Sequence, residues 1–236
     1  MTVADTRVAV VTGSNRGLGR AIVQALAEQG IHVVLTARDA RTAEEAAAPL
    51  AAQGLPVVAH QLDVTDIASV SRLVADVVFE QGRLDILVNN AAVAIDPGMA
   101  ASTLSADRLR ATFDINLFGA WQCCAEVIPH MRKHKYGRIV NLTTHMASLS
   151  TMGSSSPAYR ASKTAVNAMT RIVADELRGE NILVNAASPG PTATRMAYGK
   201  ADQTPDDAAR ALLWLATLPD DGPTGGLFHR REQLAW

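Results

Sequence analysis

Short apolar runs alternate with longer stretches of helical periodicity along most of the chain. The apolar runs are rich in Val, Ile and Leu and show little in/out alternation, which is typical of parallel strands covered on both faces. We predict strands at residues 7–12, 31–36, 56–61, 84–89, 137–142 and 181–186. We predict helices at residues 19–30, 42–54, 66–82, 105–134 and 156–179. These repeated units indicate an α/β fold, a Rossmann-type doubly wound parallel sheet of about seven strands flanked by helices.

No repeat, linker or low-complexity block interrupts this pattern, so we predict that residues 1–236 form a single dinucleotide-binding and catalytic domain. Sheets of this kind bind ligands beyond the carboxyl ends of their strands. The polar stretch at 147–156 is predicted to be a loop at that edge.

Composition excludes several classes of partner. With 22 Lys and Arg against 23 Asp and Glu, the net charge of -1 gives no field that would attract nucleic acid or an acidic membrane. We also predict no membrane span, because no run approaches the roughly 20 apolar residues required. The start lacks a secretory pattern, and Cys123 and Cys124 are too close in sequence for a disulfide framework, so we predict a cytoplasmic protein. The histidines show no metal-ligand spacing, and no metal site is predicted.

The first predicted strand leads into a glycine-rich turn, TGSNRGLG at residues 12–19, and then into a helix. Glycines let the backbone approach a pyrophosphate, and the helix N-terminus offers free N–H groups with a favourable dipole. The spacing is G-x3-G-x-G rather than the common G-x-G-x-x-G. A plain glycine-rich turn is the alternative, but the position after the first strand favours phosphate binding.

The end of the second predicted strand indicates which dinucleotide binds. An acidic residue there would take a ribose 2′-hydroxyl, whereas Ala37 is neutral and Arg38 follows it. Arg38 and Arg16 could both pair with a 2′-phosphate, so we predict NADP(H). The alternatives are that Arg38 is a solvated loop charge, or that Asp39 repels the phosphate; we expect Asp39 to point away as a turn residue.

The stretch YRASK places Tyr159 and Lys163 four residues apart in a helical pattern, so both lie on one face. A free phenol has a pKa of about 10. A nearby cation favours the phenolate and lowers that pKa, which would make the phenol a general acid. This motif is weak evidence by itself.

Six motifs in order make the chain resemble the short-chain dehydrogenase/reductase family, of its single-domain type. They are TGxxxGxG at 12–19, Asp63 with Val64, Asn89-Asn90-Ala91, Asn116, Tyr159 with Lys163, and Pro189-Gly190 with Thr194. The stretch WLATLPDDGPTGGLF at 214–228 is similar, more narrowly, to the carbonyl-reductase-like branch.

The resemblance implies a cofactor site and a catalytic group. Its implied cofactor contacts are Gly13, Asn15, Arg16, Gly17, Leu18, Gly19, Arg38, Asp63, Val64, Asn90, Ala91, Pro189, Gly190 and Thr194. Tyr159 would be the acid in reduction and the base in oxidation. Lys163 would bond the nicotinamide ribose and depress the pKa of the tyrosine, and Asn116 would hold a water that relays protons.

Two positions depart from the family pattern. Ala92 stands where glycine is usual, which predicts tighter packing. Thr144 stands where a serine usually bonds the substrate carbonyl; it keeps the hydroxyl donor but adds a methyl group that narrows the site. Ser148 is the competing donor, and a site without this donor is a third reading. His145 is either a second acid or a lining loop residue, and we favour the second.

The predicted function is NADPH-dependent transfer of hydride to a carbonyl of a small-to-medium organic substrate. Alternatives are an imine reductase, a dehydratase or epimerase of the same fold, and, in another class, a non-catalytic NADP(H) sensor or scaffold. A short substrate-covering segment around 195–206 predicts an open pocket lined by Met196 and Tyr198 in addition to Thr144 and His145. The alternative is that Met196 and Tyr198 pack on the sheet edge.

We predict a homodimer or homotetramer, because family members pair the helices that correspond to 105–134 and 156–179. Apolar side chains were expected on the outer faces of these helices. They are Leu117, Trp121, Met169 and Val173.

Overall fold

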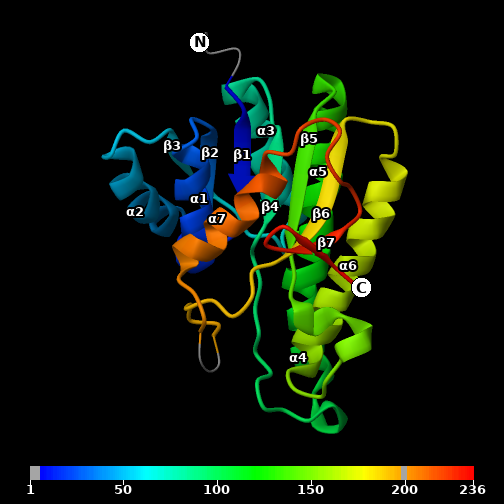
Figure 1. Cartoon of the computed structure of the whole chain (residues 1–236). Coiled ribbons are helices and arrows are strands. Elements are labelled where there is room, and N and C mark those ends of the chain that lie inside the picture. The colour runs from blue at the N-terminus through cyan, green and yellow to red at the C-terminus, as the bar shows by residue number, and fades with distance from the viewer. Residues whose placement is uncertain (1–5, 198–200) are drawn as a thin grey trace.

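The computed structural model describes residues 6–197 and 201–236, and its centre is one eight-stranded sheet in the order β3-β2-β1-β4-β5-β6-β7-β8 (Figure 1). The strands are β1 (Val8–Val11), β2 (His32–Ala37), β3 (Val57–Gln61), β4 (Ile86–Asn89), β5 (Gly137–Leu142), β6 (Ile182–Ser188), β7 (Leu227–His229) and β8 (Glu232–Leu234). β1 to β7 are parallel, and only β8 pairs antiparallel, with β7. The predicted doubly wound parallel sheet is therefore confirmed, with an antiparallel edge strand added.

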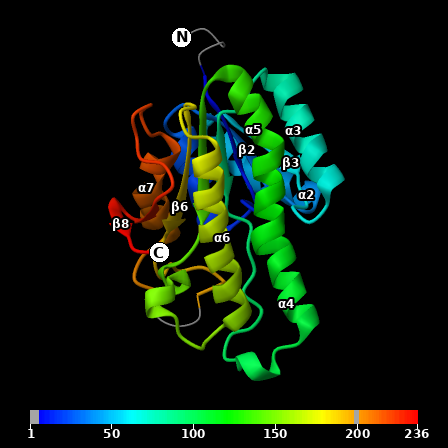
Figure 2. The same cartoon turned by 90° about the vertical axis from the view of Figure 1, so that its right-hand side faces the viewer.

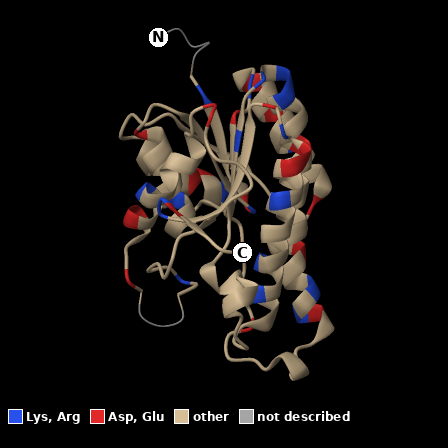
Figure 3. Ribbon diagram, turned by 45° about the vertical axis from the view of Figure 1, so that its right-hand side comes forward, with Lys and Arg blue, Asp and Glu red and all other residues tan. Residues whose placement is uncertain are grey.

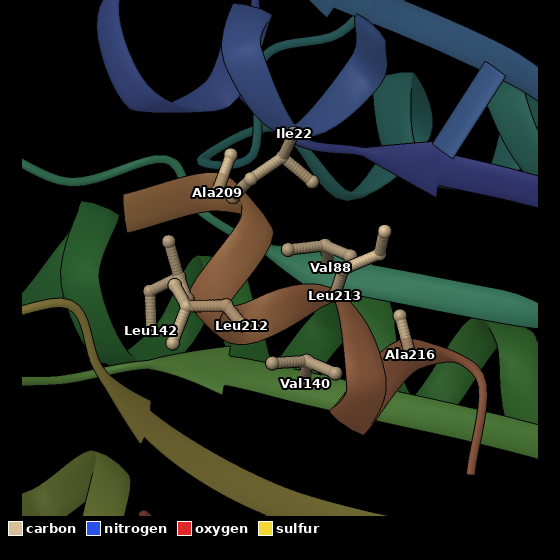
Figure 4. Close-up of a pocket in the computed structure, with 8 residues that line it drawn as sticks. All are labelled: Ile22, Val88, Val140, Leu142, Ala209, Leu212, Leu213 and Ala216. Carbon is tan, nitrogen blue, oxygen red and sulfur yellow. The ribbon is translucent and has the colours of Figure 1, made fainter. Parts of the chain in front are cut away.

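Helices cover both faces of the sheet (Figure 2). One face carries α1 (Gly17–Ala27), α2 (Ala40–Ala51) and α7 (Pro205–Ala216), and the other carries α3 (Ile67–Gln81), α5 (Ala120–His134) and α6 (Pro157–Glu176). Each face has its own apolar core, which explains why the strands read as continuous apolar runs rather than alternating ones. The small hollow in Figure 4 lies in the core that is covered by α1, α2 and α7. Its lining is wholly apolar: Ile22, Val88, Val140, Leu142, Ala209, Leu212, Leu213 and Ala216.

The predicted helix at 105–134 is divided into three parts. α4 (Ala106–Phe113) passes into a π-helical segment, Asp114–Gly119, which continues as α5. Such π turns are rare and often mark functional sites. Here the segment contains Asn116 and approaches the loop after β3, where an added β-carbon on Gly119 would lie 2.7 Å from Cγ2 of Val64.

The predicted apolar outer stripe is largely wrong. Leu117, Met169 and Val173 are buried in the core, because the π-helical segment and α6 turn these side chains inward. Trp121 is exposed as expected, at 41%. Tyr198 lies outside the described residues.

Charged residues of both signs are distributed along the outer helices (Figure 3). In the described part of the chain, no helix is both long and apolar enough to cross a membrane.

Candidate active site

Most of the predicted site residues follow the carboxyl ends of four neighbouring strands, β1, β4, β5 and β6. The chain leaves β1 toward β2 on one side and reaches β4 on the other, which is the switch point where such sheets bind ligands. The topology therefore brings the glycine loop, the Asn89-Asn90-Ala91 turn, Thr144 and Pro189-Gly190 to one edge of the sheet.

The glycine loop is hydrogen-bonded to the turn that follows β4. Nδ2 of Asn90 donates to the carbonyls of Thr12 and Gly13, at 2.8 and 2.9 Å. Oγ1 of Thr12 accepts from the amides of Asn90 and Ala91, a role that sequence reasoning missed although the hydroxyl directly precedes the first glycine. Gly13 and Gly17 have positive φ angles of 59° and 55°, which favour glycine. α1 begins without a side-chain cap, so its first N–H groups can bind an anion.

The two arginines predicted to pair with a 2′-phosphate are both exposed: Arg16 directly precedes α1, and Arg38 follows β2. The carboxyl group of Asp39 is hydrogen-bonded at the start of α2. Its Oδ1 accepts from the amide and the hydroxyl of Thr42, both at 2.9 Å, and these bonds lower the pKa of Asp39. Asp39 thus caps α2, in agreement with the turn-residue reading.

The residues predicted to contact the adenine, Asp63 and Val64, follow β3. Oδ1 of Asp63 accepts from the amide of Thr65 at 2.9 Å and from its hydroxyl at 2.7 Å. Val64 is buried against the π-helical segment. The shape of this turn is therefore fixed by its own side chains.

Tyr159 and Lys163 occupy the first two turns of α6. Lys163 is buried, and its Nζ donates to the carbonyl of Leu142 at the end of β5, at 2.7 Å. Burial lowers the pKa of Lys163 to about 8. Burial also raises the pKa of Tyr159 to about 12, which is opposite to the direction that the sequence pattern predicted, because desolvation outweighs any help from the lysine in the protein alone. A raised pKa keeps the phenol protonated, as a proton donor requires.

Replacing the buried Lys163 cation should stabilise the protein at neutral pH. The pKa falls from 10.5 to about 8 on folding, which corresponds to a cost of up to about 3 kcal/mol for holding the proton. Below pH 8 that cost is fully present, and it disappears as pH rises toward 10.5, where the unfolded lysine also loses its proton. Urea unfolding should therefore show Lys163→Met more stable than the parent at pH 7, with a smaller gain at pH 10.

The exposed Lys133 on α5 provides the control, since Lys133→Met should leave the free energy of unfolding nearly unchanged at both pH values. A Lys163→Met protein that is less stable than the parent at pH 7 would show that the bond to Leu142 outweighs the cost of burial.

Thr144 follows β5 with an extended backbone and is 8% exposed. Its Oγ1 accepts from the amide of Met146 at 3.2 Å, and no acceptor for its own proton is present among the described residues. Ser148 is engaged elsewhere, because its hydroxyl pairs with that of Ser150 at 2.8 Å. His145 is exposed, and its amide donates to Oγ of Ser188 at 3.0 Å.

The side chain of Asn116 is heavily used within the protein. Its Oδ1 accepts from the amide of Val93 at 2.8 Å, and its Nδ2 donates to the carbonyl of Val93 and to Oγ of Ser162, at 2.9 and 3.0 Å. Both amide hydrogens are therefore occupied. A water held by this side chain would have to donate to the remaining lone pair of Oδ1.

The segment after β6 returns toward the glycine loop. Gly190 has a φ angle of 79°, and an added β-carbon there would lie 2.9 Å from Cε1 of His229. Thr194 lies close to the glycine loop, because a β-carbon added to Gly17 would be 3.5 Å from Cγ2 of Thr194. The segment is closed by a bridge between Thr192 and Gln203.

The segment predicted to cover the substrate, around 195–206, lies between β6 and α7. α7 begins at Pro205, so the predicted boundary of 195–206 overlaps the first turn of that helix. Met196 is half-buried, with its amide bonded to Oγ1 of Thr194 at 3.3 Å.

The comparisons with known proteins agree with this geometry. The profile of the family described as short chain dehydrogenase matches residues 7–205. Carbonyl reductase [NADPH] 1 from Macaca fascicularis is 33% identical over 98% of this chain and 98% of its own length. The 3-oxoacyl-[acyl-carrier-protein] reductase from a Synechocystis strain is 33% identical over 93% and 92%. Salutaridine reductase from Papaver somniferum has a solved structure with a TM-score of 0.84 and 28% identity, covering 94% of this chain and 99% of that one.

The chain belongs to the short-chain dehydrogenase family. The predicted resemblance to carbonyl reductases is also confirmed, since several of them match over nearly their whole length.

Proposed function

We propose that this protein is an NADPH-dependent reductase that transfers hydride to a carbonyl carbon. The observation that carries the proposal is the placement of Tyr159 and Lys163 at the start of α6, where Nζ of Lys163 donates to the carbonyl of Leu142, two residues before Thr144 at the end of β5. The exposed Arg16 and Arg38 support NADPH over NADH, because each can pair with a 2′-phosphate. Relatives that are named as NADPH-dependent carbonyl reductases support the same cofactor.

The residues present fit this cofactor. The glycine loop and the free first turn of α1 would hold the pyrophosphate, and Lys163 would bond the nicotinamide ribose. When bound, NADPH supplies the hydride, while the protein orients the substrate and moves the proton. Tyr159 donates its phenolic proton to the developing alkoxide. Thr144 donates its hydroxyl hydrogen to the same oxygen and so stabilises the negative charge.

Substitutions at Thr144 test the oxygen-binding role. Thr144→Val keeps the shape but removes the donor, and it should lower kcat about 100-fold, the usual loss for one such donor. Thr144→Ser should retain most activity, because the donor remains. Steady-state NADPH oxidation with a reactive ketone or aldehyde measures both.

Ser148→Ala is the matched control, because Ser148 is the competing hydroxyl and its partner is Ser150. Full activity of Thr144→Val combined with loss of activity in Ser148→Ala would transfer the role to Ser148. Full activity in both variants would mean that the site works without this donor.

The short covering segment supports an open pocket that accepts bulky or planar carbonyl compounds. Met196 in that segment is half-buried, and His145 is an exposed neighbour of Thr144. Assaying a panel of small aliphatic, bulky and planar carbonyls, with cyclic imines included, tests the reaction class. NADPH that binds but is never consumed would instead favour the sensor reading.

We further propose a homo-oligomer formed through α5 and α6, which lie side by side (Figure 2). Large apolar side chains remain exposed on these helices and on the π-helical segment before α5: Phe118 at 54%, Trp121 at 41% and Ile172 at 55%. A cytoplasmic location fits the two cysteines, which are both free thiols.

A further inference from the structure

The helix that carries Tyr159 begins without a cap of its own. Ser156 precedes it in a left-handed conformation, with φ 49°, and its side chain makes no capping hydrogen bond. Pro157, the first helical residue, has no N–H group. The first unsatisfied donors of α6 are therefore the amides of Ala158 and Tyr159.

A distant residue supplies the missing cap. Oδ2 of Asp96, in the loop after β4, accepts from the amide of Ala158 at 2.6 Å and from that of Tyr159 at 3.3 Å. Asp96 is fully buried, and its Oδ1 has no hydrogen-bond partner in the described part of the chain. A buried, half-satisfied carboxyl group is an expensive way to cap a helix. Its placement at a helix N-terminus, where the dipole favours negative charge, offsets part of that cost.

The loop that carries Asp96 is itself anchored at two points. The side chain of Asn116 hydrogen-bonds to both the amide and the carbonyl of Val93. Nη1 of Arg108 donates to the carbonyl of Ile95 at 2.6 Å. The cap is therefore attached to a backbone that is fixed relative to the π-helical segment.

The backbone carbonyl of Tyr159 is hydrogen-bonded within the same network. Oγ of Ser162 donates to the carbonyl of Tyr159 at 2.8 Å and accepts from Nδ2 of Asn116 at 3.0 Å. The amide of Tyr159 is thus held by Asp96 and its carbonyl by Ser162, and both connections lead back to Asn116.

We propose that Asp96 is a positioning residue: by capping α6 it holds the backbone of Tyr159 where the phenol can reach the substrate oxygen. The inference rests on the proposed function, because the position of Tyr159 affects turnover only if Tyr159 is the proton donor. Without the cap the first turn of α6 frays, and Tyr159 moves away while the glycine loop stays intact. The defect therefore falls on kcat and not on NADPH binding.

The test compares Asp96→Ala with Asp96→Asn. Asp96→Ala removes the cap and should lower kcat at least about tenfold, since a displacement of about 1 Å can cost 100-fold. NADPH affinity, measured by fluorescence titration, should change by less than about twofold, and Asp96→Asn should restore kcat to within about threefold because its side-chain oxygen can still cap.

Asp66→Ala is the matched control, because Asp66 caps α3 by accepting from the amide of Ala68 at 2.9 Å, in a helix that carries none of the catalytic groups. It should lose stability but keep kcat. If Asp96→Ala does not fold, Asp96→Ser tests the same point, since its shorter side chain cannot reach the helix.

The proposal is overturned if either uncapped variant keeps the parent kcat, or if Asp96→Asn is as impaired as Asp96→Ala. Failure of the proposed function has a different signature, namely an active Tyr159→Phe protein.

Discussion

Tyr159→Phe is expected to bind NADPH as the parent does and to lose about 1,000-fold in kcat, within the range that a general acid contributes. The substitution removes only the phenolic oxygen, so the packing of the ring at the start of α6 is preserved. The cofactor loop lies on other elements and should be unaffected. Fluorescence titration with NADPH measures the binding, and single-turnover reduction of an activated ketone measures the chemical step.

Tyr136→Phe is the control for this experiment. Tyr136 is also buried, its hydroxyl has no partner among the described residues, and its ring lies between the guanidinium groups of Arg7 and Arg138 at 4.1 and 4.2 Å. It precedes β5, at the opposite end of that strand from Thr144. Tyr136→Phe should therefore have the kcat of the parent. If Tyr159→Phe also kept the parent kcat, Tyr159 would not be the proton donor.

Gly19→Ala is expected to abolish NADPH binding, with at least a 100-fold weaker affinity, because the added methyl group has no room. Its β-carbon would lie 2.5 Å from Nδ2 of Asn90, 2.8 Å from Cα of Ser14 and 3.0 Å from the carbonyl oxygen of Gly13. Two of these three atoms belong to the backbone of the glycine loop, so the loop must shift. Isothermal titration with NADPH and thermal unfolding measure the effect.

Gly153→Ala is the corresponding control. Its β-carbon would meet only the far end of the Arg160 side chain, at 3.4 Å, which can move aside. It should bind NADPH normally. Unchanged affinity in Gly19→Ala would contradict the assignment of this loop to the cofactor.

The sheet and most helices follow from periodicity, because each buried element needs an apolar face. The antiparallel β8 and the three-residue β7 do not, since such short strands carry no pattern of their own. The π-helical segment was also not predictable. Its residues continue the helical periodicity of the segments on either side. Its place in the fold depends on the close packing of Val64 against Gly119, which the sequence does not show.

The candidate site was predictable where a motif fixes both residue and position, as for the glycine loop and for Tyr159 with Lys163. The direction of the Tyr159 pKa was not, since it depends on burial that spacing cannot show. Asp96 was not found either, because it lies 62 residues before the amide of Ala158 that it caps. The sequence even suggests the opposite, because a serine before a helix normally caps that helix itself. Only the structure shows that the backbone of Ser156 is left-handed and that its side chain makes no capping bond.

The most direct test of the reductase assignment follows label from deuterated NADPH into the product of a carbonyl panel. The account predicts that at least one carbonyl compound yields an alcohol carrying a single deuterium on its former carbonyl carbon. It also predicts that Tyr159→Phe binds the same cofactor but forms almost none of this product. NADPH that binds tightly without label transfer to any compound, or equal transfer by the parent and Tyr159→Phe, would contradict it.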